Sequence, residues 1–276
     1  MNPLLYEEMA KRALEEDIGF EDLTTEAIVS PFQESTAEII VKEEGVLAGI
    51  GIAETCFRML DPEAKFTAKA KDGEKIFSGQ VIATVSGRTR AILSAERTAL
   101  NFLQRLSGIA TSTQRAVEIV KDFNCRIVDT RKTTPGLRAL EKYAVRVGGG
   151  FNHRFGLYDA VLIKDNHIQA AGGILKAVSL VQAKVGHMVK IEVETETLDQ
   201  VREALSTGAD IIMLDNMSLA LMKEAVALIN GQALTEASGG ITLDKLAQVA
   251  ATGVDLISLG WLTHSARSLD ISLDFA

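Results

Sequence analysis

Short apolar runs that end in charged or small polar residues recur through the second half of the chain. From the second run onward they repeat at steps of roughly 22 to 28 residues, the length of one strand, one helix and two loops. Continuous apolar runs are typical of strands buried in a parallel sheet. The pattern therefore predicts a (β/α) barrel with its reactive groups where the strands end. The six runs are residues 126–132, 160–167, 189–194, 211–216, 233–240 and 256–260.

The number of runs leaves the completeness of this barrel open. A full (β/α) barrel has about eight strands, whereas six runs are present. Either the barrel is incomplete, or a further helix-dominated unit lies around residues 142–158. We therefore predict an α/β fold with a TIM-like (β/α) barrel, and the residues alone leave its completeness open.

The first hundred residues follow a different pattern, with strand-like alternation between turn signals. Apolar positions at helical spacing predict a first helix, and a second helix is expected in the middle of this region. Alternation near the C-terminus predicts a last strand that returns to it. The helices are expected at 4–16 and 53–60, and the strands at 36–41, 64–70, 81–85 and 269–275.

These patterns predict two domains. Residues 1–108 form a smaller N-terminal α/β domain of mostly antiparallel strands, which the segment 268–276 rejoins, and residues 109–267 form the barrel. Between them a helical pattern begins at Ala91, with Ser94 as a candidate N-cap. Ser107-Gly108 is expected to end that helix, and a second helix is expected over 111–121.

Composition excludes several classes of protein. The formal net charge of −8 argues against a general binder of nucleic acids or membrane surfaces, which needs a basic face. No apolar stretch approaches the roughly 20 residues of a transmembrane helix. The two cysteines, Cys56 and Cys125, lack metal-site spacing, so we expect reduced, packed thiols in a cytoplasmic protein.

The segment 126–167 reverses the charge of the chain, with eight basic residues against four acidic ones. Some of these cations, spaced four residues apart, fit a solvated helix face equally well; they are Arg138, Lys142 and Arg146. Others lie at strand ends or beside a glycine run, where side chains point into a barrel mouth and would bind a polyanion. These are Arg131, Lys132, Arg154 and Lys164.

Two acids are expected to face these cations from the middle strands. Glu192 and Glu194 share one face of a strand, and Glu194 is preferred because it lies nearer the C-terminal end. Asp215 ends an apolar run that would bury it, so its carboxylate needs a partner. The candidates are Lys164, a Mg²⁺ ion carried by a phosphate substrate, or sugar hydroxyls. A structural ion pair inside the barrel is the alternative.

A phosphate site is predicted after the last two strands. Ser238, Gly239 and Gly240 follow the penultimate strand and precede a helix, where exposed N–H groups and the helix N-terminus favour an anion. The last strand ends at Gly260, with His264 just beyond. The loops after these two strands commonly bind phosphate in barrels of this kind.

Nine short motifs, taken together and in order, resemble one enzyme family. They cover residues 96–101, 106–111, 129–138, 148–154, 162–167, 192–194, 214–216, 236–240 and 262–265. The family is quinolinate phosphoribosyltransferase (decarboxylating), the nicotinate-nucleotide pyrophosphorylases of NAD biosynthesis. The resemblance covers nearly the whole chain and is most specific over 129–167. One position differs from the family pattern: this chain has Thr134 where an apolar residue is expected.

The resemblance implies a fold, a reaction and a site. The fold would be a small N-terminal α/β domain and an incomplete (β/α) barrel. Quinolinate and 5-phosphoribosyl 1-pyrophosphate would give nicotinate mononucleotide, pyrophosphate and CO₂, with Mg²⁺ as cofactor, in a homodimer or a higher oligomer. Arg97 would reach the partner subunit's site. Glu194 and Asp215 would address the ribose and Mg²⁺, and Lys132 and Lys164 would take part in catalysis. The quinolinate ligands would be Arg131, Lys132, His153, Arg154 and Lys164, and the 5′-phosphate ligands Ser238, Gly239, Gly240, Gly260 and His264.

Two other functions remain open from the sequence. A related phosphoribosyltransferase, including the molybdenum-transport-associated homologues, would share the phosphate residues but need not keep a pocket for two carboxylates. A non-catalytic phosphosugar-binding protein would keep Ser238-Gly239-Gly240 but would have no use for Glu194, Asp215 and Arg97 together.

Overall fold

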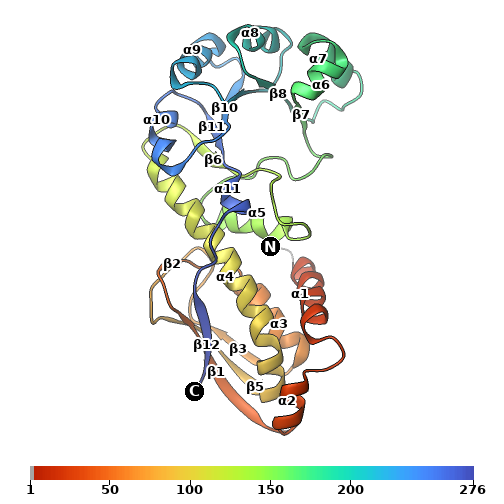
Figure 1. Cartoon of the computed structure of the whole chain (residues 1–276), viewed down its shortest axis with the longest axis vertical. Coiled ribbons are helices and arrows are strands. Elements are labelled where there is room, and N and C mark those ends of the chain that lie inside the picture. Colours follow the sequence, from red (N-terminus) through yellow and green to blue (C-terminus); the bar gives the residue numbers. More distant parts are fainter. Residues whose placement is uncertain (1–2) are drawn as a thin grey trace. The chain divides into compact units, whose positions relative to one another are not determined.

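The computed structural model describes residues 3–276, which divide into two compact units (Figure 1). The first unit contains the described residues up to Gln114, together with Thr133–Gly149 and Leu262–Ala276. The second unit contains Arg115–Lys132 and Gly150–Trp261. Each unit is built around one main sheet.

An antiparallel sheet organises the first unit. Its strand order is β12-β1-β5-β3, so the last strand of the chain pairs with the first. Side chains on β1 alternate between exposed or half-buried and fully buried, because one face of the sheet is covered by helices. The strands are β1 (Glu34–Val41), β3 (Lys65–Ala68), β5 (Val81–Arg88) and β12 (Ile271–Phe275), and a two-stranded ribbon adds β2 (Gly45–Val46) and β4 (Lys75–Ile76).

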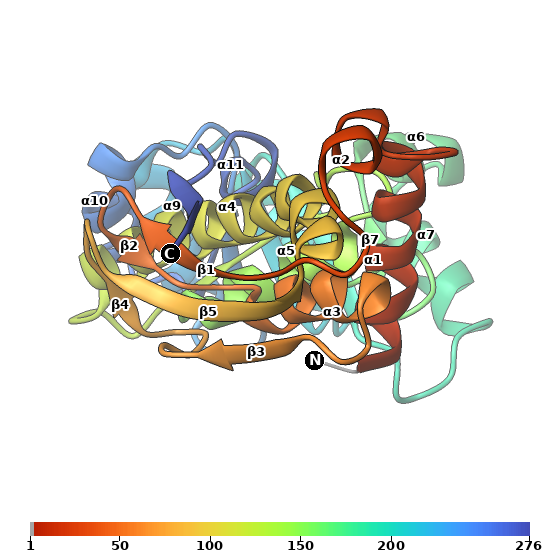
Figure 2. The ribbon, with the colours of Figure 1, turned by 90° about the horizontal axis from the view of Figure 1, so that it is seen from below.

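Helices α3 and α4 lie on the same side of this sheet (Figure 2). Their apolar faces are buried there, and α1 packs in turn on α3. The helices of the first unit are α1 (Pro3–Ile18), α2 (Leu23–Ile28), α3 (Ile50–Leu60), α4 (Thr89–Val120) and α5 (Arg138–Val147).

Helix α4 is continuous through Ser107-Gly108, so the predicted helix break there is wrong. A Cβ on Gly108 would lie 2.0 Å from the carbonyl oxygen of Arg267, so glycine lets the C-terminal segment approach the helix. Ser107 is buried, and its hydroxyl accepts a hydrogen bond from the Ala48 N–H at 3.0 Å. The N-cap predicted at Ser94 is also wrong, because Ser94 lies inside the helix and donates to Asp22 at 2.9 Å.

The second unit contains a parallel sheet of six strands in the order β6-β11-β10-β9-β8-β7. All six correspond to the predicted apolar runs, and the helices that follow β7, β8, β9 and β10 lie along the outer side of the strands (Figure 1). The strands are β6 (Arg126–Val128), β7 (Val161–Ile163), β8 (Ile191–Thr195), β9 (Ile211–Asp215), β10 (Leu234–Ser238) and β11 (Leu256–Ser258). The helices are α6 (Asp165–Ala171), α7 (Ile174–Gln182), α8 (Leu198–Ser206), α9 (Leu219–Ile229) and α10 (Leu246–Ala250), preceded by the 3₁₀ turn η1 (Leu243–Lys245); α11 (Trp261–His264) follows β11.

The barrel is incomplete, which decides between the two alternatives. Strands β6 and β7 form the two edges of the sheet, and within residues 3–276 they do not pair with each other. Instead, Val128 at the end of β6 forms a single parallel bridge to Phe151. The region 142–158 therefore extends the sheet by one residue pair and supplies the end of α5, but no complete strand.

A buried carboxylate fixes α5 against α4 in the first unit. Glu141 is fully buried and accepts hydrogen bonds from Arg105 at 2.8 Å and from both the N–H and the hydroxyl of Thr134, at 3.0 and 2.8 Å. Arg105 also donates to the carbonyl oxygens of Thr263 and Ala266. Thr134 is therefore polar because its hydroxyl satisfies a buried acid.

Two expectations about individual side chains can be compared with the fold. Lys142 is only 1% exposed, so a fully solvated face with Arg138 and Arg146 is wrong for this position. Cys56 is buried and Cys125 half-buried, both as free thiols, and burial raises their pKa values to about 12 and about 11. Across residues 3–276, no helix is both long and apolar enough to span a bilayer.

The close approach at Gly108 predicts the effect of adding one methyl group. Gly108→Ala should lower the free energy of unfolding by about 2 kcal/mol, because neither backbone can move away without disturbing its unit. Gly186→Ala is the control, since a Cβ there meets nothing within 4 Å. Chemical denaturation of both variants measures the difference. A Gly108→Ala variant as stable as the control would contradict this explanation of the glycine.

Candidate active site

The carboxyl ends of β8, β9 and β10 carry the predicted acids and the predicted phosphate loop. Parallel pairing places Glu194 opposite Met213, and Asp215 opposite Ser238, so these strand ends are neighbours. Lys164 follows β7, the next strand along the sheet. The sequence-predicted residues of the second unit therefore lie along one edge of its sheet.

Lys164 forms an ion pair with Glu194, and not with Asp215. The Glu194 side chain is 10% exposed, whereas that of Lys164 is 46% exposed, so a mostly buried carboxylate holds a cation that still reaches solvent. The Lys164 N–H donates to His167 Nδ1 at 2.9 Å, which fixes the start of α6. Asp215 accepts a hydrogen bond from the amide of Asn216 at 2.7 Å and stays half-exposed.

The loop after β10 has a backbone that favours glycine. Gly239 has φ +93° and Gly240 has φ +57°. A Cβ on Gly239 would lie 2.2 Å from the side-chain oxygen of Asn216, so this glycine also permits close contact with the loop after β9. Trp261 ties the loop to the end of β11, because its indole N–H donates to the Ile241 carbonyl at 2.9 Å.

The predicted cations of the second unit have different surroundings. Burial, and next the nearby charge of Arg131, lower the pKa of Arg154, whereas the charge of Glu192 opposes that shift. One guanidinium nitrogen of Arg154 donates to the Ala160 carbonyl at 3.1 Å, while its buried Nε has no hydrogen-bond partner among the described residues. Lys132 is exposed, and its N–H donates to the Thr130 hydroxyl. A partly buried guanidinium with an unused donor suits an anionic ligand.

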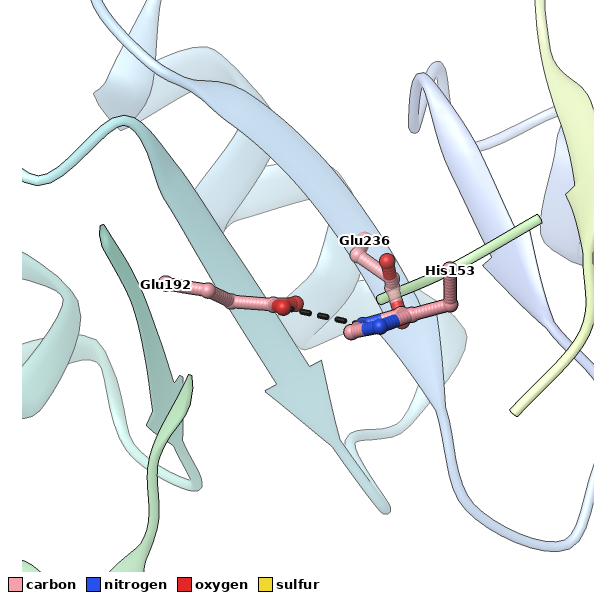
Figure 3. A group of neighbouring side chains, drawn as sticks. All are labelled: His153, Glu192 and Glu236. Carbon is pink, nitrogen blue, oxygen red and sulfur yellow. Dashed lines mark ion pairs between the residues drawn. The ribbon is translucent and has the colours of Figure 1, made fainter. Parts of the chain in front are cut away.

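His153 extends toward two buried acids, Glu192 and Glu236 (Figure 3). Its Nε2 lies 2.9 Å from Glu192 Oε2 and 3.6 Å from Glu236 Oε1. Its Nδ1 accepts a hydrogen bond from the N–H of Arg154 at 2.7 Å. Glu192 comes from β8 and Glu236 from β10, so the ring links two strands of the sheet.

The two acids of this cluster are almost inaccessible, at 3% and 1% exposed for Glu192 and Glu236. Burial, and next the charge of Glu192, raise the pKa of Glu236 to about 8, against a smaller opposing effect of His153. Glu236 is therefore mostly protonated at neutral pH. One oxygen of each carboxyl group makes no hydrogen bond within the described residues.

Asp129 anchors the segment that contains His153. This carboxylate is fully buried and follows β6. One of its oxygens accepts from the His153 N–H at 2.9 Å and the other from the Asn152 amide at 2.6 Å. Three buried carboxylates, Asp129, Glu192 and Glu236, thus surround one short segment of chain.

Two predicted site residues belong to the first unit. Arg97 is exposed on α4 and makes no hydrogen bond or ion pair with any described residue. His264 is exposed, and its ring contacts the Ser265 hydroxyl at 2.6 Å. Gly260 belongs to the second unit, between β11 and Trp261.

The sequence reasoning assigned no role to Glu236, Asp129 and Asn152, and ranked Glu192 below Glu194. For Glu192 the signal was present, because alternate strand residues share a face. Glu236 also lies two residues before the strand end at Ser238, on the same face. The alternation could therefore have indicated a second, deeper layer of acids, but that layer was not predicted.

Comparison with known proteins identifies the family. The sequence pattern of the quinolinate phosphoribosyl transferase C-terminal domain matches residues 109–274, and that of the N-terminal domain matches residues 22–107. The chain is 51% identical over 274 residues to a probable nicotinate-nucleotide pyrophosphorylase (carboxylating) of Bacillus subtilis, covering 99% of this chain and 94% of that relative. It is 45% identical over 285 residues to quinolinate phosphoribosyltransferase (decarboxylating) 2b, mitochondrial, of Nicotiana tabacum, covering 96% and 81%.

Solved structures agree with these relatives. The crystal structure of NadC from Streptococcus pyogenes superposes with a TM-score of 0.96 at 43% identity, covering 100% of this chain and 99% of that one. The nicotinate-nucleotide pyrophosphorylase from Francisella tularensis superposes with a TM-score of 0.95 at 39% identity, covering 100% and 98%. Sequence patterns over both halves of the chain and full-length relatives lead to one conclusion: the chain belongs to the quinolinate phosphoribosyltransferase family.

Proposed function

We propose that this enzyme transfers the phosphoribosyl group of 5-phosphoribosyl 1-pyrophosphate to quinolinate with loss of CO₂, in the de novo synthesis of NAD. The observation that carries the proposal is the order in which basic, acidic and phosphate-binding groups follow one another along one edge of the sheet. Lys164 follows β7, acids end β8 and β9, and the Ser238 loop ends β10. That order suits the dianion quinolinate, then the ribose and then the 5′-phosphate of phosphoribosyl pyrophosphate, bound side by side along the edge.

The basic residues favour quinolinate over the substrates of related enzymes. Quinolinate carries two carboxylates on adjacent ring carbons, which call for several cations in one place. Arg154 has an unused buried donor, and its pKa is lowered first by burial and next by the nearby charge of Arg131. A non-catalytic phosphosugar-binding protein would have no need of such a pair beside Glu194 and Asp215.

The chemistry needs no protein base. The pyridine nitrogen attacks C1 of the ribose as the bond from that carbon to pyrophosphate breaks, and the product is a pyridinium. The cationic ring then takes up the electrons of the C2–carboxylate bond as CO₂ leaves, and C2 gains a proton. Lys164 and Lys132 orient the quinolinate carboxylates, while the carboxylates of Glu194 and Asp215 stabilise the positive charge that develops on the sugar.

Mg²⁺ fits the donor set of the acidic strand ends. Carboxylate oxygens on neighbouring strands are the ligands this ion prefers, and it usually binds through one or two carboxylates together with substrate phosphates. Glu194 and Asp215 would hold it, directly or through water. When bound with the substrate, Mg²⁺ supplies positive charge that stabilises the departing pyrophosphate.

We infer a homodimer in which Arg97 enters the partner subunit's site. Arg97 is exposed and makes no pair with a described residue. The segment before β1 exposes large apolar side chains and is tied to the same part of α4, since Arg90 binds Glu26 and Ser94 binds Asp22. An exposed apolar group of this size is typical of an interface. Its members are Phe20, Leu23, Ile28 and Phe32.

A cytoplasmic location is part of the proposal. It is supported by two cysteines that remain free thiols, as expected in a reducing compartment.

The substrate assignment predicts a specific product. The purified enzyme with quinolinate, phosphoribosyl pyrophosphate and Mg²⁺ should release CO₂ and nicotinate mononucleotide in equal amounts, and nicotinate should not replace quinolinate.

Arg154→Ala and Lys164→Ala should lower kcat/KM for quinolinate by roughly a hundredfold or more, because misplacing or losing an orienting cation costs about that factor. Activity near wild type in both variants would contradict the assignment of quinolinate to these cations. Chelation of Mg²⁺ should abolish turnover, and added Mg²⁺ should restore it.

Shared sites predict complementation between inactive variants. Arg97→Ala and Lys164→Ala homodimers should each be nearly inactive. Mixed at equal amounts and allowed to exchange subunits, they should recover about a quarter of the wild-type activity, because half of the dimers are mixed and each has one intact site. The control mixture of Arg154→Ala with Lys164→Ala should recover nothing. No recovery in the first mixture would place Arg97 outside the partner's site.

The phosphate loop predicts a fluorescence signal from the single tryptophan of the chain, Trp261. Phosphoribosyl pyrophosphate should change its emission, since the indole is bonded to the loop after β10. Gly239→Ala should raise the Kd measured this way by about tenfold or more, because the added methyl group displaces Asn216 and the loop. The control is Gly231→Ala, which has a similar positive φ of +74° but no neighbour within 4 Å. Equal Kd values in the two variants would count against a phosphate site here.

A further inference from the structure

Asn216 has a backbone conformation that residues other than glycine rarely adopt. Its φ is +52°, in the left-handed region. Within residues 3–276 one other residue besides glycine has a positive φ, Asn230, and this residue is the C-cap of α9, where left-handed residues are common. Asn216 instead directly follows Asp215, the last residue of β9. Left-handed backbone outside helix caps is found mainly where neighbouring contacts impose it, and functional sites are frequent among these places.

The side chain of Asn216 lies between two parts of the proposed phosphoribosyl site. Its Nδ2 donates to Asp215 Oδ2 at 2.7 Å. Its amide oxygen lies so close to the loop after β10 that a Cβ on Gly239 would be 2.2 Å from it. One amide group thus lies against both the acid assigned to the ribose and the loop assigned to the 5′-phosphate.

The backbone of Asn216 joins the same two strand ends. Its N–H donates to the Ser238 carbonyl at 3.0 Å, one step beyond the pairing of Asp215 with Ser238. The chain then enters α9 within two residues, since Ser218 is the N-cap of that helix. Glycine would make this short turn without strain. The turn alone therefore favours glycine, and the amide group is what asparagine adds.

We propose that Asn216 is a positioning residue that fixes the spacing between the Asp215 carboxylate and the loop after β10. This inference rests on the proposed function, because it takes these groups as ligands of the ribose and the 5′-phosphate. The two parts of the substrate are joined covalently, so their ligands must stand at one distance to bind both. Within residues 3–276 the Asp215 carboxylate accepts a side-chain hydrogen bond from the Asn216 amide alone, so its direction depends on that amide.

The first test separates the amide from the turn. Asn216→Gly keeps the left-handed turn and removes the amide. It should raise the Kd for phosphoribosyl pyrophosphate about tenfold, because a hydrogen bond to a charged group is worth about that factor. Asn230→Gly makes the same change at the left-handed helix cap and should match wild type. Isothermal titration calorimetry in the presence of Mg²⁺ measures the Kd without turnover, and thermal unfolding checks that both variants are folded.

Steady-state kinetics adds a readout that a general loss of structure would not give. In Asn216→Gly, KM for quinolinate at saturating phosphoribosyl pyrophosphate should stay within about twofold of wild type, because effects at separate sites are nearly independent. KM for phosphoribosyl pyrophosphate should rise together with its Kd. An equal rise in both KM values would contradict a role confined to the phosphoribosyl site.

The second test measures the coupling between Asn216 and its two neighbours. Gly239→Ala should raise the Kd about tenfold or more in the wild-type background. In the Asn216→Gly background the same methyl group should cost at least about threefold less, because the amide atoms it would meet are gone. The strain of alanine at φ +93° is common to both backgrounds. A matching cycle of Asn216→Gly with Asp215→Ala should also be non-additive, since the Asp215 carboxylate accepts from the amide.

Three outcomes would overturn the inference. Equal Kd values for Asn216→Gly and Asn230→Gly would mean that Asn216 serves the turn alone. Additive losses in both cycles would mean that the amide acts on the substrate directly and fixes nothing between its neighbours. A wild-type protein that does not bind phosphoribosyl pyrophosphate would instead overturn the proposed function, and this inference with it.

Discussion

The site depends on the parallel register of β8, β9 and β10. Because strand residues alternate between faces, β8 and β10 each place a second acid two positions before a polar residue near their carboxyl end, on the same face, whereas β9 has Met213 there. Glu194 and Ser238 form the upper layer, while Glu192 and Glu236 lie one layer deeper. The upper layer is the one proposed to border the substrate, and the lower layer contacts His153. Barrel interiors are usually filled by such layers, although mostly with apolar side chains.

A polar lower layer is tolerated because its charge is limited. Two buried carboxylates in contact cannot both be ionised cheaply, and the raised pKa of Glu236, caused by burial and next by the charge of Glu192, favours its neutral form. The charge of Glu192 acts on Arg154 in the opposite direction to burial. It therefore favours the charged form of Arg154, on which the charge of Arg131 acts in the opposite direction. An apolar layer would give no such support.

The sequence predicted the strand ends well and their surroundings poorly, for a physical reason. A strand end is a local feature, so Glu194, Asp215 and the Ser238 loop could be identified from runs of apolar residues. The role of a buried acid depends on a partner that is distant in sequence. Glu192 and His153 are brought together only by the fold, and the same holds for Gly108, whose neighbour Arg267 comes from the end of the chain. Local patterns identify such a glycine only as a helix breaker.

A buried carboxylate that accepts a backbone N–H also occurs in the first unit, where it fixes backbone next to a predicted site residue. Glu141 accepts the N–H of Thr134, two residues after Lys132, and Arg105 donates to the carbonyl of Thr263, one residue before His264. Removing either member of the Arg105–Glu141 pair would leave buried hydrogen-bonding groups unpaired, which costs more than the pair itself contributes. Buried acids thus hold the backbone next to exposed residues that the proposed function assigns to the site. Hydrogen bonds to that backbone are the interactions through which these acids act on the site in the proposed function.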